Sequence, residues 1–311
     1  MKAKIYLLTF ITLLCISCKD NKVNPQQTEA STIDTTIQKI VENVLYKQLD
    51  TLQADRGIVI VMDVQTETIK AIASKNYSEN DSIEFGGLFS VASMMIALDD
   101  SIISPSDEID TGNGTLEYGG FTVRDHYYLK GGLGKITDEE VILVASNVGI
   151  AKIILKGYES NPQRYIEGIN KLGFTNITKY DKWKKTTLPW LSFGYEVKVT
   201  PLQILQFYNS IASKKVNCSA STLQAIQKML VGVIEIGTGQ SVKSDKVFIA
   251  GKTGTVQIGE NKQRVSFCGY FPADNPKYSC IVIIDNPKNG ILSSGIMAGG
   301  VFKEIAEKIS Q

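Results

Sequence analysis

The stretch VFIAGKTGTVQIG, residues 247–259, places a Lys-Thr-Gly-Thr sequence among apolar and β-branched residues. Such a run is typical of a strand, and it predicts one over 246–258 that carries a lysine and two hydroxyl groups. Two more apolar runs follow at 265–271 and 278–285, and the chain closes on the helical pattern AGGVFKEIAEKI. The C-terminal part is therefore predicted as three strands and a helix.

The N-terminal part is also predicted to contain a helix and strands, but here the helix comes first. Apolar residues recur at helical spacing over 37–54, and two β-branched runs, 57–64 and 68–74, are joined by a short turn that indicates a hairpin. A buried helix is predicted over 88–103, a loop-rich section over 112–135, and a helix over 137–147 that opens on a capping box of Thr137 with Glu140. The middle of the chain, 150–235, is mostly helical in pattern, with Pro201 at a helix start. Strands at both ends with helices between them predict an α+β fold in which the terminal segments share one sheet.

Composition excludes several classes of function. The chain has 311 residues, of which 43% are hydrophobic, and 33 basic against 32 acidic side chains leave a formal net charge of +1. A nucleic-acid partner is not expected from so small a charge. The single histidine, His126, and five cysteines do not supply the ligands of a zinc, haem or iron–sulfur site, so no metal or cofactor is predicted. His126 lies in RDHYY, which reads as a surface turn rather than as the base of a Ser-His-Asp site.

The first residues carry targeting information. A basic MKAK precedes an apolar run of 13 residues, which as a helix of about 20 Å is too short for a bilayer core of about 30 Å. We interpret 1–18 as a signal peptide that closes on CISC, similar to a bacterial lipoprotein processing site with Cys18 as the lipidated residue. A simple secreted protein cleaved nearby is the alternative. Residues 19–36 are polar and predict a tether, 37–311 form the domain, and the expected location is the cell envelope, on a lipid-anchored protein.

Several segments, in the right order, resemble the transpeptidase domain of class B penicillin-binding proteins. They are GIVIVMDVQTETIKAIAS, VTPLQILQFYNSIAS, MLVGVIEIGTGQSV, AGKTGTVQ and SFCGYFPADNPKYSCIVIIDNP. The resemblance covers about 55–311 and implies a five-stranded antiparallel sheet flanked by helices, with a helical subdomain. It also implies an acyl-transfer site between them that acts on peptidoglycan stem peptides and β-lactams. Family enzymes usually carry a long N-terminal pedestal, whereas only 19–56 separates Cys18 from the first strand here.

The catalytic positions of that family are altered in this chain. The helix tail IALDDSII aligns Gly87 with the family's nucleophilic serine and Ser90 with its lysine, and ASNVGI aligns Ala145 with the first serine of the second motif. Other motif residues are unchanged, and the resemblance implies that they bind substrate. They are Asn147, Lys252, Thr253, Gly254 and Thr255. Ser90 and Ser93 have no lysine or histidine three or four residues away, so neither has a base to activate it.

These losses lead to the hypothesis of a non-catalytic homologue. Lys252, Thr253 and Thr255 are predicted to bind a peptide carboxylate by charge and hydroxyl groups, and Gly87 and Thr255 to direct backbone N–H groups at a carbonyl or carboxylate. The expected partners are stem peptides or proteins of cell-wall synthesis. Two alternatives stay open: an active D,D-transpeptidase or carboxypeptidase with a displaced serine, and a scaffold with an empty cleft.

Two cysteines lie equally far from the centre of the last hairpin. Cys268 and Cys280 flank Asp274 symmetrically, so they are predicted to face each other across two strands. Both a disulfide and two small buried thiols are compatible with that placement.

Overall fold

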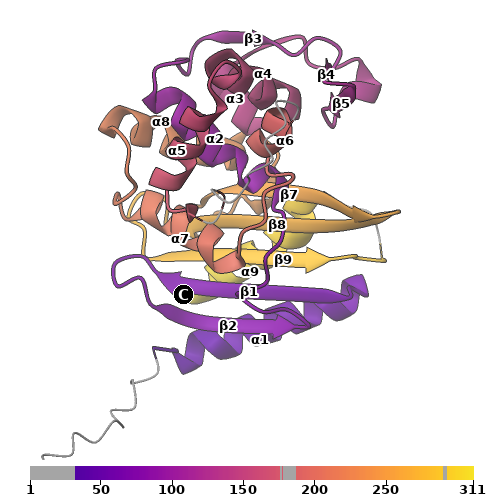
Figure 1. Cartoon of the computed structure of the whole chain (residues 1–311). Helices are drawn as coiled ribbons and strands as arrows, with labels where there is room; N and C mark the ends of the chain where they lie inside the picture. Colours follow the sequence, from indigo (N-terminus) through magenta and orange to yellow (C-terminus); the bar gives the residue numbers. More distant parts are fainter. Residues whose placement is uncertain (1–31, 176, 178–186, 290–292) are drawn as a thin grey trace, which may run out of the picture. The chain divides into compact units, whose positions relative to one another are not determined.

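One antiparallel sheet joins the two ends of the chain in the computed structural model, which describes residues 32–175, 177, 187–289 and 293–311 (Figure 1). Its order is β2-β1-β9-β8-β7, with every neighbouring pair antiparallel. The strands are β1 (Arg56–Asp63), β2 (Ile69–Lys75), β7 (Ala250–Gly259), β8 (Lys262–Phe271) and β9 (Tyr278–Asp285). The predicted five-stranded sheet is confirmed, and β7, with the Lys-Thr-Gly-Thr sequence, is an edge strand.

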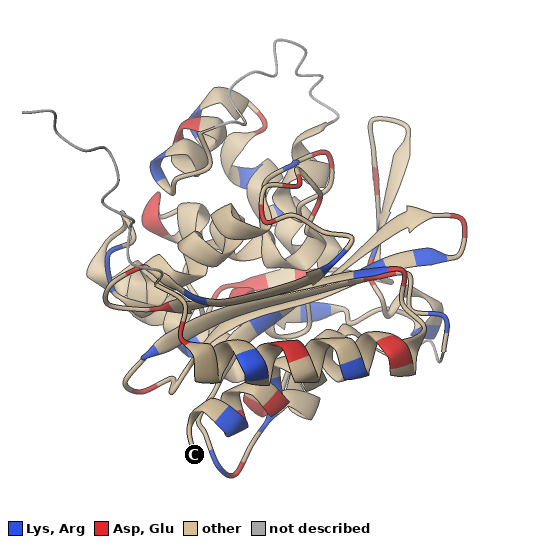
Figure 2. Ribbon diagram, turned by 90° about the horizontal axis from the view of Figure 1, so that it is seen from below, with Lys and Arg blue, Asp and Glu red and all other residues tan. Residues whose placement is uncertain are grey.

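Two helices cover one face of this sheet, α1 (Thr35–Leu52) and α9 (Ser294–Ile309), as Figure 2 shows from below. Basic and acidic residues alternate along the outer side of α1, and its apolar side is buried. The helix begins two residues before the predicted start, because Asp34 accepts hydrogen bonds from the N–H groups of Thr36 and Ile37.

The other helices lie on the opposite face and above the sheet (Figure 1). They are α2 (Ser90–Asp99), α3 (Asp138–Leu143), α4 (Asn147–Tyr158), α5 (Pro162–Lys171), α6 (Leu188–Ser192), α7 (Pro201–Ala212) and α8 (Ala220–Glu235). The predicted capping box of Thr137 with Glu140 is present at α3, and Pro201 is the first residue of α7, as predicted.

One predicted helix is interrupted. The pattern of 137–147 predicts a continuous helix, but α3 ends at Leu143 because Ala145 takes a positive φ of 54°. Ser146 then caps α4, since its Oγ accepts a hydrogen bond from Gly149 N–H at 2.8 Å. The chain therefore turns sharply at the second catalytic motif of the family.

The segment between α2 and α3, predicted as loop, contains two small two-stranded sheets, of which only the second is a hairpin. One pairs β3 (Glu108–Asp110) with β6 (Lys135–Thr137), and the other pairs β4 (Thr115–Tyr118) with β5 (Phe121–Arg124). Short 3₁₀ turns lie at Gly86–Leu88 (η1), Tyr128–Lys130 (η2) and Gln240–Val242 (η5). His126 is exposed in a turn next to β5, as predicted.

The two cysteines of the last hairpin do not face each other, so that prediction is wrong. Cys268 is opposite Ile281 in the β8–β9 register, and Cys280 is opposite Gly269. A shift of one residue in a strand turns a side chain to the other face of the sheet. Both thiols are buried and free, on opposite faces.

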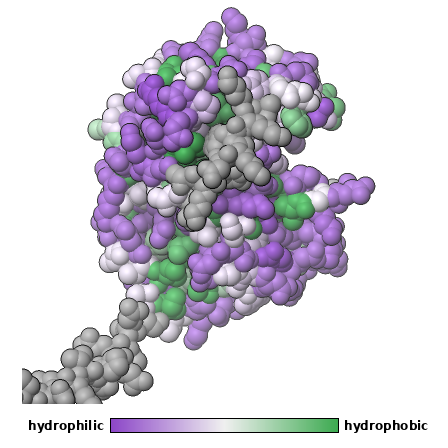
Figure 3. Space-filling model, in the orientation of Figure 1, coloured by the Kyte–Doolittle hydropathy of each residue, from purple (hydrophilic) through white to green (hydrophobic). Residues whose placement is uncertain are grey.

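The surface gives no sign of a large apolar face in the view of Figure 3, where hydrophilic residues dominate and hydrophobic ones gather in small separate patches. Across the described residues, no helix combines the length and the apolar character needed to span a bilayer. The predicted signal peptide, Cys18 and most of the tether lie outside the described residues.

Candidate functional site

The turn η1, which precedes α2, lies directly against the edge strand β7. A Cβ built on Gly87 would be 3.0 Å from the carbonyl oxygen of Thr253 and 3.4 Å from Nζ of Lys252. Gly86 has a φ of +55°, and a Cβ there would meet the carbonyl oxygen of Thr255 at 2.4 Å, so only glycine fits. The structure thus brings Gly87 beside the Lys-Thr-Gly-Thr strand.

Lys252 is buried with its amine directed at this turn. Its side chain has no exposed surface, and within the described part of the chain its Nζ donates one hydrogen bond, at 3.2 Å, to the carbonyl of Thr253. Burial lowers the pKa of Lys252 to about 7, with no charged neighbour contributing. The uncharged amine beside Gly87 is therefore populated at a lower pH than that of an ordinary lysine.

The other residues of the strand differ in their access to solvent. Thr253 is buried and shares a hydrogen bond of 2.8 Å with Thr238, which follows α8. Gly254 has no room for a Cβ, which would lie 2.6 Å from the carbonyl of Phe85. Thr255 is exposed. Lys252, Thr253 and Thr255 were predicted to bind a carboxylate. Of these three described residues, only Thr255 has a side chain that is open to solvent.

The two serines of α2 are engaged in local hydrogen bonds. Ser90 Oγ donates to the carbonyl of Gly87 at 2.7 Å. Ser93 Oγ is bonded to the hydroxyl of Tyr165 and to the carbonyl of Ser192. Across the described residues, no hydrogen bond joins a serine hydroxyl to a lysine amine. Neither serine of α2 is therefore paired with a base.

The second motif is hydrogen bonded to the end of β5 and the loop that follows it. Asn147 Nδ2 donates to the carbonyl of Arg124 at 3.1 Å, and Ser146 Oγ donates to the buried carboxylate of Asp125 at 2.8 Å. That carboxylate also accepts a hydrogen bond from Val148 N–H, and burial raises its pKa. Asp125, which sequence reasoning missed, anchors the loop after β5 to the start of α4. Among the described residues, no hydrogen bond joins Asn147 to Gly87.

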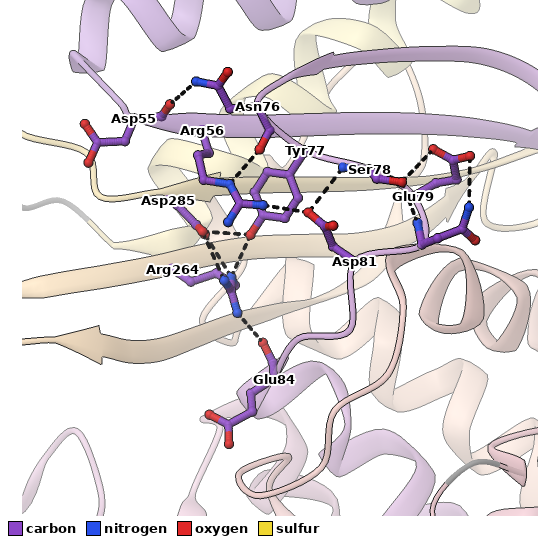
Figure 4. A network of polar contacts seen from close by, with 11 residues as sticks. Asp55, Arg56, Asn76, Tyr77, Ser78, Glu79, Asp81, Glu84, Arg264 and Asp285 are labelled. Carbon is purple, nitrogen blue, oxygen red and sulfur yellow. Dashed lines mark hydrogen bonds and ion pairs between the residues drawn. The ribbon is translucent and has the colours of Figure 1, made fainter.

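A buried polar cluster holds the segment that leads into η1 (Figure 4). Arg264 on β8 makes a two-pronged ion pair with Asp285 on β9, at 2.8 and 3.0 Å, and its Nε also donates to the hydroxyl of Tyr77. Its Nη1 donates to the carbonyl of Glu84 at 3.1 Å, two residues before Gly86. No local pattern in the sequence could have revealed this cluster, because Arg264 and Glu84 are 180 positions apart.

The segment after α6 closes the site from the other side. Tyr195 accepts a hydrogen bond from Gln257 N–H near the end of β7, and Glu196 N–H donates to the Glu84 carboxylate at 2.9 Å. Gly194 accepts from Gly86 N–H, so its backbone rests on the turn itself. Arg264 on β8 and the segment from Gly194 to Glu196 therefore hold the backbone around Gly86 and Gly87 against β7. In the described residues, no group of three His, Cys, Asp or Glu side chains is arranged to hold a metal ion.

An antiparallel sheet whose edge strand carries Lys-Thr-Gly-Thr, facing the start of a buried helix, defines the architecture of the serine acyl-transferases that act on peptidoglycan and bind penicillin. The chain belongs to the penicillin binding protein transpeptidase domain family, whose model matches residues 57–309.

Named relatives agree with this assignment. The chain is 27% identical to the probable peptidoglycan D,D-transpeptidase PenA of Neisseria flavescens, over 88% of this chain and 80% of that protein. It is 27% identical to the peptidoglycan D,D-transpeptidase FtsI of Buchnera aphidicola, over 89% of this chain and 57% of that protein. The chain thus spans little more than half the length of some of these relatives.

Solved structures show the same fold. The transpeptidase domain of penicillin-binding protein 3 from Burkholderia pseudomallei matches with a TM-score of 0.80 and 25% identity, over 91% of this chain and 96% of that domain. A protein of Burkholderia ambifaria, described as a peptidoglycan glycosyltransferase, matches with a TM-score of 0.80 at 24% identity.

Proposed function

We propose that this chain is a non-catalytic homologue of the penicillin-binding transpeptidases, which binds stem peptides of peptidoglycan in the cell envelope. The observation that carries the proposal is the pair of replacements on η1 and α2. Glycine occupies the nucleophile position, and the serine at the lysine position donates its hydroxyl proton to the carbonyl of that glycine.

Acyl transfer through a covalent intermediate needs an attacking oxygen and a base that takes its proton. Gly87 has no side chain, and Ser90 and Ser93 are both buried and hydrogen bonded to other groups. Loss of the nucleophile from a serine hydrolase costs about 10⁶-fold in turnover. An active enzyme whose serine is displaced to another position on α2 is therefore not supported.

Binding is the function that the remaining geometry supports. Thr255 presents its hydroxyl on an edge strand, and the Gly87 backbone faces the same strand. An edge strand offers N–H and C=O groups to an extended peptide. The signal peptide and Cys18, together with the names of the relatives, support an envelope location with a lipid anchor. Stem peptide is proposed over a protein partner of cell-wall synthesis because the kept motif is the peptide-binding one of the family.

The non-catalytic part of the proposal is tested with a fluorescent penicillin. The purified chain is incubated with the reagent, denatured and run on a gel, where only an acyl-enzyme keeps the label. We expect no labelled band, beside a strongly labelled active penicillin-binding protein as control. A labelled band that unlabelled penicillin competes away would show a working serine.

The binding part is tested by co-sedimentation with purified peptidoglycan. Thr255→Val removes an exposed hydroxyl and keeps the shape of the side chain, and we expect it to weaken binding about 3- to 10-fold, as for one lost hydrogen bond. Thr66→Val, in the exposed β1–β2 turn, is the matched control. If the wild-type protein stays in the supernatant, it does not bind peptidoglycan, and the scaffold with an empty cleft becomes the remaining alternative. Binding that Lys252→Ala and Thr255→Val both leave unchanged would place the contact outside this strand.

A further inference from the structure

We propose that Lys252 is a base directed at position 87, so that this site lacks only an attacking oxygen and a single serine there completes a reactive pair. The lysine that the family uses is absent at position 90. The amine of Lys252 lies where it can take over that task, 3.4 Å from the Cβ that residue 87 would carry.

The geometry favours proton transfer. A hydroxyl one bond beyond that Cβ reaches a hydrogen-bond distance of about 2.6–3.2 Å from Nζ when the Cβ–Oγ bond is inclined to the line between Cβ and the amine rather than pointing along it. The Cβ itself meets the Thr253 carbonyl at 3.0 Å, a tight contact that a shift of a few tenths of an ångström relieves. Lys252 is held in place by its own burial and by its hydrogen bond to that carbonyl.

The surroundings keep the amine available as a base. Cys268 is opposite Lys252 on β8, and Tyr208 on α7 packs beside that cysteine and donates to the carbonyl of Leu88. Burial raises the pKa of both Cys268 and Tyr208, so neither is an anion near neutral pH. Ser90, on α2, is un-ionised as well. With no anion against it, the amine loses its proton readily, and burial lowers the pKa of Lys252 to about 7.

The reaction of the serine variant with a penicillin is balanced without any further group. The serine proton passes to Nζ of Lys252 as Oγ forms a bond to the lactam carbonyl carbon. The lactam C–N bond breaks, and the ring nitrogen takes the proton from the ammonium. The product is an ester on residue 87 with Lys252 uncharged again.

The experiment compares four proteins: wild type, Gly87→Ala, Gly87→Ser, and Gly87→Ser combined with Lys252→Met. Each is treated with a fluorescent penicillin and, separately, with p-nitrophenyl acetate, and the acyl group is located by mass spectrometry of peptides. We expect Gly87→Ser alone to be acylated on residue 87, at least about 10²-fold faster than the double variant, the usual gain from a positioned base. Gly87→Ala reports whether the fold accepts a Cβ.

Two results would overturn the inference. The first is that the Gly87→Ser protein melts at the same temperature as the Gly87→Ala protein but is not acylated by p-nitrophenyl acetate. The other is a double variant that is acylated as fast as Gly87→Ser, since the base would then be another group. The penicillin arm rests on the proposed function, because it needs a cleft that admits the drug. Acylation by the ester without labelling by penicillin would uphold Lys252 as the base and count against stem-peptide binding.

A measurement on the wild-type chain covers the case in which both variants at position 87 unfold. Nuclear magnetic resonance of labelled lysine follows the Lys252 amine directly. Loss of its proton between pH 6 and 8 agrees with a base at this position. An amine still protonated at pH 9 would refute it.

Discussion

Lys252 shows how burial changes the acid–base behaviour of a lysine against which no anion lies among the described residues. Burying an ammonium group without an anion costs free energy, so burial lowers the pKa of the group and it loses its proton more easily. The cost is tolerated here because the stem of the side chain fills the space between β7 and η1. The same residue thus stabilises by packing and destabilises by charge, and the balance depends on pH.

This balance predicts how stability varies with pH. The pKa of Lys252 is about 7 in the folded chain against 10.5 for an ordinary lysine. Between these values the unfolded chain binds one more proton, so the free energy of unfolding rises with pH by up to about 1.4 kcal/mol per unit, and the full cost of the buried charge applies below pH 7. Lys252→Met should therefore be stabilising at pH 6, with the gain shrinking towards pH 9.

Urea unfolding at pH 6, 7, 8 and 9 measures this difference. The exposed Lys277→Met is the control, and it should leave the pH profile of the wild type unchanged. A gap between Lys252→Met and wild type that stays constant from pH 6 to 9 would show that Lys252 remains charged throughout.

At the scale of elements, the polar cluster of Figure 4 connects the sheet to the turn that carries Gly87. Arg264 and Asp285 sit at opposite positions in the β8–β9 register, and their side chains are 8% and 4% exposed. The guanidinium satisfies the carboxylate, the Tyr77 hydroxyl and the Glu84 carbonyl at once. Removing one of these side chains leaves the polar groups of the others buried without hydrogen-bond partners.

Arg264→Met should therefore lower the free energy of unfolding by about 3–5 kcal/mol. Combining it with Asp285→Leu removes the stranded charge and should restore most of the loss. Denaturant unfolding of the two single variants and the double variant measures the coupling. Lys215→Met, which breaks the half-exposed pair with Glu67, is the control and should cost only about 0–1 kcal/mol. A double variant as unstable as the sum of the two single variants would contradict the account.

At the scale of the whole molecule, residues 32–311 form one folded unit, which α1 completes. The apolar side of α1 packs against β1, β2 and α9. Asp34 N–H also donates to the carbonyl of Lys70, so the start of the helix is tied to β2. The side chains that α1 buries are Ile37, Val41, Val44, Leu45, Leu49 and Leu52.

Two truncations test this boundary. A chain that begins at Thr32 should melt at the same temperature as the full chain, because the described contacts of the unit begin there. A chain that begins at Asp55 lacks α1 and should fail to fold, since each buried aliphatic side chain contributes about 1.5–3 kcal/mol against a total stability of about 5–15 kcal/mol. Cooperative unfolding of the Asp55 chain, followed by circular dichroism, would show that α1 is dispensable.

The sequence predicted every strand of the main sheet and most helices, because apolar periodicity and capping residues are local signals. The capping box of Thr137 and the start of α7 at Pro201 were both found in this way. The break at Ala145 was missed, since alanine favours helices and its positive φ is imposed by the turn into α4. The pairing of Cys268 with Cys280 failed because symmetry about a turn does not fix the register.

By itself the sequence determined the fold family, because that depends on which motifs follow one another along the chain, and it predicted that Gly87 and Ser90 stand at the catalytic positions. Only the tertiary structure decided the burial of Lys252, the direction of its amine and the cluster around Arg264. Those properties arise where strands and turns distant in the chain exclude water from the same small volume, and no local pattern records which groups will meet there.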